Sequence, residues 1–137
     1  MKHKSIYMEA KYNEATINRP EGDRVLDAPF VFTDLVKYSR QLKEEEAWKK
    51  NDRNGITVYK TDDVTMVLTW LHKDALIMDN VLDGLVVLQV LEGRIEFAVE
   101  NGKTELHEKQ MITLHAGIMH TVKAIDDALI LITTKSA

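Results

Sequence analysis

The sequence predicts an all-β domain preceded by an N-terminal arm and one α-helix. From Ile56 onward, short β-branched and aromatic runs alternate with polar or glycine turns, which is typical of strands. Only residues 33–50 have the composition of a helix. The 137 residues, of which 45% are hydrophobic, are enough for one soluble globular domain with its own core.

Residues 1–32 form the predicted arm, because they show no sustained helical or alternating periodicity. They contain both prolines of the chain, Pro20 and Pro29, and a turn-like run at residues 18–23. The apolar residues here are too many for a disordered tail and too few for a separate core. We therefore expect the arm to pack on the main body or on a partner subunit. These apolar residues are Ile6, Tyr7, Ile17, Val25, Leu26, Phe30 and Phe32.

Residues 33–50 form the predicted helix. Thr33 suits an N-cap, and Asp34 suits the positive end of a helix. We expect one buried stripe and a solvated charged face. The stripe comprises Leu35, Tyr38 and Leu42, with Trp48 as a further candidate, while residues 43–46 and 49–50 face water. Asparagine and glycine tolerate left-handed backbone angles, so Asn51, Asp52, Asn54 and Gly55 are expected to end this helix.

Residues 51–137 form the predicted β-domain. Thr61-Asp62-Asp63 predicts a hairpin, and Glu92-Gly93 and Asn101-Gly102 predict further turns. Closely spaced short strands favour a sandwich or a barrel, because either arrangement removes exposed sheet edges. The expected strands are 56–60, 64–71, 84–91, 94–100, 104–108, 111–114, 120–124 and 128–133.

Composition excludes several kinds of chemistry. The chain has no cysteine, so it has no disulfide, no thiolate zinc site and no thiol nucleophile. A net charge of −4 argues against electrostatic binding to nucleic acid or to an anionic membrane. The sequence contains no long apolar span and no signal-peptide core, so we expect a cytoplasmic location.

Two motifs resemble the signatures of the cupin superfamily. A strand ends in the turn Leu91-Glu92-Gly93, as in the first cupin motif. Residues 115–120 read His-Ala-Gly-Ile-Met-His, which places Gly117 and His120 in register with the Pro-x-Gly-x-x-His of the second motif. The resemblance covers about residues 73–124 and implies a small jelly-roll barrel with an internal pocket, often a homodimer.

The same resemblance implies that the metal centre is degenerate. In metal-binding cupins, the first motif supplies His-x-His and a glutamate, and the second supplies the last histidine. Counting back from Gly93, the glutamate position falls on Val86. The histidine positions fall on Asn80 and Leu82, or on Asp79 and Val81 with a longer spacing. Of the usual ligands only His120 remains, so we do not expect a metal cofactor.

Three readings of the histidines remain open. His72, His115 and His120, with Asp79 or Asn80, could form an unorthodox site for a divalent metal, which needs about three converging ligands. A pocket histidine could instead act as a general acid or base. Alternatively, His120 is a pocket histidine held by a backbone or hydroxyl partner, with His72 and His115 at the rim, hydrogen-bonded to loops.

Apolar residues at the former ligand positions predict a dry pocket. Val86 is one of them, and the candidate pocket residues are His72, Asn80, Val86, His115 and His120. Met66, Met78, Met111 and Met119 are expected to be mostly core. Arg19, Arg24 and Arg53 could hold an anionic ligand at the rim or pair with acidic loops. His107 is expected to face solvent.

These observations lead to three hypotheses on function, and whether the protein is an enzyme stays open. The first is a metal-free barrel that binds or senses a small molecule, as a homodimer. The second is a metal-dependent or histidine-based cupin enzyme, such as an isomerase or a dioxygenase-like protein, acting on a small organic substrate. The third is a dimeric structural or interaction module, with the arm as its contact. An apolar pocket too small for a ligand would favour the third.

Overall fold

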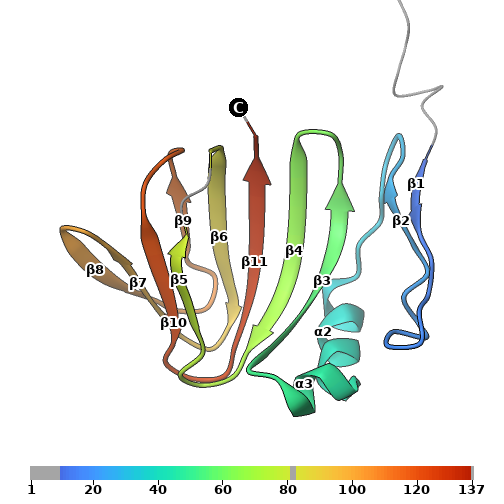
Figure 1. Ribbon diagram of the computed structural model, residues 1–137, viewed down its shortest axis with the longest axis horizontal. Coiled ribbons are helices and arrows are strands. Elements are labelled where there is room, and N and C mark those ends of the chain that lie inside the picture. The colour runs from blue at the N-terminus through green and yellow to red at the C-terminus, as the bar shows by residue number, and fades with distance from the viewer. Residues whose placement is uncertain (1–9, 81–82, 137) are drawn as a thin grey trace, which may run out of the picture.

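The computed structural model describes residues 10–80 and 83–136, which form an N-terminal hairpin, two helices and two larger β-sheets (Figure 1). One sheet has five strands in the order β3-β4-β11-β6-β9, and the other has four in the order β5-β10-β7-β8. Every described strand pairing is antiparallel. The two sheets face each other as an open jelly-roll barrel, which confirms the predicted all-β class.

The strands of the five-stranded sheet are β3 (Arg53–Lys60), β4 (Val64–Leu71), β11 (Ala128–Lys135), β6 (Leu85–Glu92) and β9 (Met111–Leu114). Those of the four-stranded sheet are β5 (Leu76–Asn80), β10 (His120–Ala124), β7 (Ile95–Val99) and β8 (Gly102–Leu106). All eight expected strands are present with shifted ends, and the hairpin at Thr61-Asp62-Asp63 joins β3 to β4. The arm strands β1 (Lys11–Asn13) and β2 (Arg24–Asp27), and also β5, were not predicted because these short segments lack a clear alternation.

The barrel interior is a continuous apolar core built from alternate residues of both sheets. On β11, Ala128 and Ile130 point inward, while Leu129 and Leu131 belong to a second cluster on the outer face. This strand is therefore buried on both faces, which explains its uninterrupted apolar sequence. The inner cluster comprises Leu71, Ala75, Val86, Leu88, Val90, Ile95, Phe97, Leu106, Leu114, Val122, Ala124, Ala128 and Ile130.

The helices cover the outer face of the five-stranded sheet (Figure 1). Leu42 of α2 (Leu35–Glu44) is fully buried against this face, together with Ile56 and Leu68. The Trp70 indole donates a hydrogen bond to the carbonyl of Ser39, at 2.9 Å. None of the helices within the described residues is long and apolar enough to cross a membrane.

The predicted single helix over 33–50 is interrupted. It divides into α2 and α3 (Glu46–Lys50), and Glu45 between them is extended, with φ −76° and ψ 147°. Asp34, rather than Thr33, is the N-cap, because its carboxylate accepts a hydrogen bond from the Lys37 amide. The break coincides with a polar cluster around the Glu45 carboxylate, which sequence periodicity does not reveal.

Asn54 and Gly55, expected to end the helix, instead lie inside β3. The Asn54 side-chain amide donates to the Leu42 carbonyl at 2.8 Å and to the Glu45 carboxylate at 3.0 Å, so it ties the end of α2 to the sheet. A Cβ on Gly55 would lie 2.7 Å from Thr69 Oγ1. Only glycine therefore fits where β3 crosses this threonine.

The arm covers the outer edge of β3 with arginine side chains rather than with another strand. Arg24 Nε donates to the Thr57 carbonyl at 2.7 Å, and Arg19 Nη2 donates to the Gly55 carbonyl at 2.9 Å. Because Gly55 and Thr57 are two residues apart, their carbonyls point to the same side of the strand. Pairing of the edge carbonyls protects β3 from joining another sheet.

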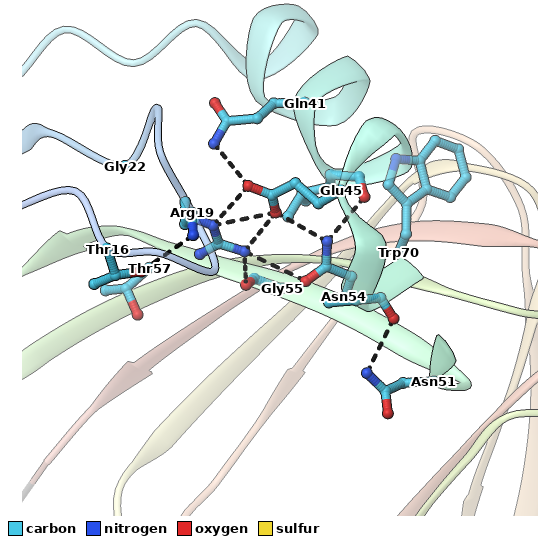
Figure 2. Close-up of polar contacts among 12 residues, drawn as sticks. Thr16, Arg19, Gly22, Gln41, Glu45, Asn51, Asn54, Gly55, Thr57 and Trp70 are labelled. Atoms are coloured by element: carbon cyan, nitrogen blue, oxygen red, sulfur yellow. Dashed lines mark hydrogen bonds and ion pairs between the residues drawn. The ribbon is translucent and has the colours of Figure 1, made fainter. Parts of the chain in front are cut away.

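Arg19 also forms an ion pair with Glu45 at the break between the helices (Figure 2). Arg19 Nη2 lies 2.9 Å from Glu45 Oε1, and Arg19 Nε lies 3.0 Å from Oε2. Burial alone would raise the pKa of Glu45, but hydrogen bonds from Arg19, Asn54 and Gln41 together hold it below its ordinary value. The carboxylate is therefore ionised in the folded protein at neutral pH.

We predict that Arg19→Met lowers the free energy of unfolding by about 2 to 4 kcal/mol at pH 7, because it leaves the Glu45 carboxylate without its counter-charge. A carboxyl group whose pKa is depressed by folding contributes stability above its unfolded pKa and loses that contribution as pH falls through its folded value. The difference in the free energy of unfolding between the variant and the wild type should therefore become smaller below about pH 4. Urea unfolding across pH measures it.

Arg40→Met is the matched control, because Arg40 is exposed and forms no ion pair among the described residues. Its effect should stay within about 0.5 kcal/mol. An equal loss in both variants, or a difference for Arg19→Met that does not change with pH, would contradict the assigned role of this pair.

Candidate functional site

The internal pocket implied by the cupin resemblance is a small apolar cavity between the two sheets. Its volume is about 20 Å³. That is room for about one water molecule, far below the roughly 300 to 1,000 Å³ of ligand sites. The cavity is lined by Ile77, Val86, Leu88, Phe97, Ile112, Leu114, His120, Val122 and Ile132.

Among the described residues that line the cavity, His120 is the one polar residue. It starts β10, is 5% exposed and packs its ring on Phe97 with 5.7 Å between the ring centroids. Nδ1 lies 3.0 Å from the Ile118 carbonyl. A carbonyl only accepts, so Nδ1 carries the proton, and in the neutral ring Nε2 has a free lone pair. Nε2 has no hydrogen-bond partner among the residues that the structure describes.

His72 does not line the cavity. It follows β4 and stacks on the Trp48 indole, with 3.4 Å between centroids and 10° between the planes. Its Nε2 donates to the Trp48 carbonyl at 2.8 Å, and its Nδ1 lies 4.0 Å from an Asp127 carboxylate oxygen. These contacts attach α3 to the barrel, so the geometry gives His72 a structural role.

The other three candidates lie as follows. Val86 is buried in the cavity wall, at the position where a metal-binding cupin has its glutamate. His115 is exposed in the loop before β10 and does not line the cavity. Asn80 ends β5, and its backbone is paired with His120. The Asn80 and Asp79 side chains, and also Val81 and Leu82, lie outside the described part of the chain.

The described side chains do not fit a metal ion. Across residues 10–78 and 83–136, no three histidine, aspartate or glutamate side chains converge on one point. His72, His115 and His120 therefore do not form a joint site. A first-row divalent metal held by His120 alone would lack the further ligands that offset its desolvation.

Other sequence expectations have mixed outcomes. Met78, Met111 and Met119 are 62%, 58% and 57% exposed, so the expectation of mostly core methionines is wrong for these three. Arg53 pairs with Asp52, Arg19 with Glu45, and Arg24 with backbone carbonyls, so these arginines are engaged in the fold. His107 is exposed and lies 2.8 Å from Glu105, as expected for a solvent-facing residue.

Sequence reasoning missed an exposed apolar segment between the arm and α2. Phe30 is 85% exposed, Phe32 is 83% exposed and Val36 is 60% exposed. We call these three residues the linker face. Phe30 and Phe32 were expected to pack on the main body or on a partner subunit, and the main body leaves both of them exposed.

We predict that neutral His120 is protonated on Nδ1. Long-range ¹H–¹⁵N NMR spectra recorded at pH 8 should show the Nε2 resonance at the chemical shift of an unprotonated imidazole nitrogen. His107, which is exposed, provides an internal reference in the same spectrum. A proton found on His120 Nε2 would contradict the hydrogen bond to Ile118 and the acceptor assigned to the cavity.

Among the comparisons with known proteins, only the comparison of structures finds similar proteins. No protein-family model matches the sequence, and no curated protein matches it significantly. A cupin superfamily protein from Desulfitobacterium hafniense DCB-2 is similar with a TM-score of 0.62 at 15% identity, over 64% of this chain and 80% of that one. An RmlC-like cupin from Shewanella frigidimarina NCIMB 400 has a TM-score of 0.59 at 15% identity, over 63% and 78% of the two chains.

An enzyme also belongs to these structural neighbours. A variant of salicylate 1,2-dioxygenase from Pseudoaminobacter salicylatoxidans has a TM-score of 0.68 at 13% identity. The match covers 80% of this chain but only 36% of the dioxygenase. At these identities the similarity concerns the fold, and it agrees with the jelly-roll topology and with the two sequence motifs. The chain has the fold of the cupin superfamily.

Proposed function

We propose that this protein is an interaction module that forms a homodimer through the linker face, with a barrel that serves as its rigid core. The observation that carries the proposal is the exposure of Phe30 and Phe32, at 85% and 83%. Exposing two phenylalanine side chains to water is unfavourable in free energy, because each has about 150 to 250 Å² of mainly apolar surface that could be buried in a contact.

The barrel interior supports the same proposal. A cavity of about 20 Å³ offers no room for an organic ligand unless its walls separate. The walls are branched aliphatic residues and Phe97, packed from both sheets. Of the three hypotheses drawn from the sequence, a cavity of this size favours the interaction module.

A second copy of this chain is the partner that we propose for the linker face. In a two-fold contact the same patch is used by both subunits, so one apolar face per chain is sufficient. The two phenylalanines and Val36 together offer roughly 400 to 600 Å² per chain. That is a large part of the roughly 800 Å² per partner in a standard interface. The cupin resemblance points to homodimers as well.

Dimerisation should depend on the linker face. We predict that Phe30→Ser combined with Phe32→Ser converts a dimer into a monomer at micromolar concentration, because the contact loses most of its apolar area. Size-exclusion chromatography with light scattering measures the mass. The monomeric variant should remain folded, since both side chains are exposed within one chain, and its melting temperature should fall only by the contribution of subunit association.

Met78→Ser combined with Met111→Ser is the matched control, because these methionines are 62% and 58% exposed on the barrel. It should leave the dimer intact. A monomeric wild type would contradict the proposal, and so would a dimer that survives the loss of both phenylalanines.

One observation favours a second candidate function, the binding of a small molecule in the barrel. His120 presents an unprotonated Nε2 in an apolar cavity, which suits a compact ligand with one hydrogen-bond donor. Such a ligand must separate the walls on entry. Binding of a small molecule would become the leading function if an apolar molecule co-purified in stoichiometric amount with the wild type and was absent from His120→Ala.

A further inference from the structure

A groove lies outside the barrel, between the turn of the arm and the two helices. Its volume is about 660 Å³, a size that holds a drug-sized molecule. Three apolar residues line it: Ile17, which is 98% exposed, Pro20 and Ala47. Glu21 and Glu44 are among its polar lining residues. We call the surface around these five residues the arm–helix groove.

The groove is continuous with the linker face along α2. A shallow depression of about 260 Å³ connects them. Val36 of the linker face lines this depression, and so do Glu21 and Glu44 of the groove. Val36 and Glu44 lie eight residues apart on α2, which is about 12 Å along the helix axis. The linker face and the groove therefore lie on one surface, at opposite ends of α2, where a single partner can cover both.

Two charged residues of α2 offer an ion pair across a two-fold contact. Lys37 near its start and Glu44 at its end are exposed, and neither forms an ion pair among the described residues. They are too far apart on one helix to pair with each other. If two copies of α2 run antiparallel, each Lys37 lies beside the Glu44 of the other copy. Lys50 also lines the groove, so its charge is mixed and fixes the register of a partner rather than driving association.

The linker face alone is too small for a stable interface. Its three side chains offer roughly 400 to 600 Å² per chain, against about 800 Å² per partner in a standard interface. The groove supplies the missing surface, and its concave shape suits aromatic side chains, which contribute most to binding when they fill a pocket. In a two-fold contact each copy presents both parts to the other, so both linker faces are seated at once.

We propose that Phe30 and Phe32 of each copy insert into the arm–helix groove of the other copy. The homodimer then has two equivalent contacts, one on each side of its two-fold axis. The two copies of α2 run antiparallel, and Lys37 of each copy pairs with Glu44 of the other. Ile17, which is exposed within one chain, is covered by the phenyl rings of the second copy. This arrangement rests on the proposed function, because it specifies the place at which the linker face of one copy binds the other.

Ile17→Asp tests the groove. The side chain is 98% exposed within one chain, so the variant should fold normally by circular dichroism, but it places a charge beneath the phenyl rings. The dissociation constant of the dimer, measured by analytical ultracentrifugation, should rise at least about tenfold. Met119→Asp is the matched control, because Met119 is 57% exposed in the loop before β10 and does not line the groove. It should change the dissociation constant by less than about twofold.

Charge reversal tests the antiparallel register. Lys37→Glu and Glu44→Lys should each weaken the homodimer by about threefold to tenfold, because like charges then face each other at both contacts. An equimolar mixture of the two variants should form a heterodimer with close to the wild-type affinity, because opposite charges face each other again at both contacts. The same ultracentrifugation experiment measures all three samples.

The outcomes separate this arrangement from the proposed function. A wild-type chain that stays monomeric would overturn both. A dimer that Phe30→Ser combined with Phe32→Ser dissociates, but that Ile17→Asp leaves intact, would overturn the arrangement and leave the proposed function standing. A mixture of the two charge variants that associates no more tightly than either variant alone would also overturn the arrangement.

Discussion

The guanidinium of Arg19 holds together three parts of this protein that are distant in sequence. It pairs with Glu45 where the predicted helix breaks, and it donates to the Gly55 carbonyl at the open edge of β3. Asn54 closes the cluster by donating to Glu45 and to the end of α2. Together with the hydrogen bond of Arg24 to the Thr57 carbonyl, these contacts fix the arm against the edge strand β3, which the arm covers (Figures 1 and 2). The arm then leads into the linker face and α2.

The second constraint is that the five-stranded sheet is buried on both faces. The inner face packs into the barrel and the outer face packs under α2, so strands such as β11 have almost no polar residue in their buried part. Val86 and Leu88 contribute to this packing at positions from which a metal-binding cupin would direct polar groups inward. His120 is the polar residue that remains in the cavity wall, held by the Ile118 carbonyl. The packed interior therefore stabilises the fold, and the most exposed large apolar side chains, Ile17, Phe30 and Phe32, lie on the arm.

Most of the fold follows from local sequence signals. The strands after Ile56 and the hairpin at residues 61–63 are predictable because alternation and turn residues are local properties. The cupin motifs also single out His120, which lies in the wall of the internal cavity. The helix break at Glu45 depends on the contact with Arg19, and the place of Gly55 within β3 depends on the contact with Thr69. Both contacts join residues that are distant in sequence, so a local sequence pattern does not reveal them. Likewise, nothing local distinguishes the exposed Phe30 and Met78 from residues of the core, because their exposure depends on what the rest of the chain leaves uncovered.

The central claim is that the described interior of this barrel is a packed apolar core, in which the side chains of residues 10–78 and 83–136 form no set of metal ligands. The most direct test is the metal content of the protein, purified without an affinity tag or chelator and measured by mass spectrometry in wild type and in His120→Ala. We predict less than about 0.1 divalent metal ion per chain in both, because no set of three metal-ligating side chains that includes His120 is found across residues 10–78 and 83–136. Close to one metal ion per wild-type chain, lost in His120→Ala, would contradict the claim.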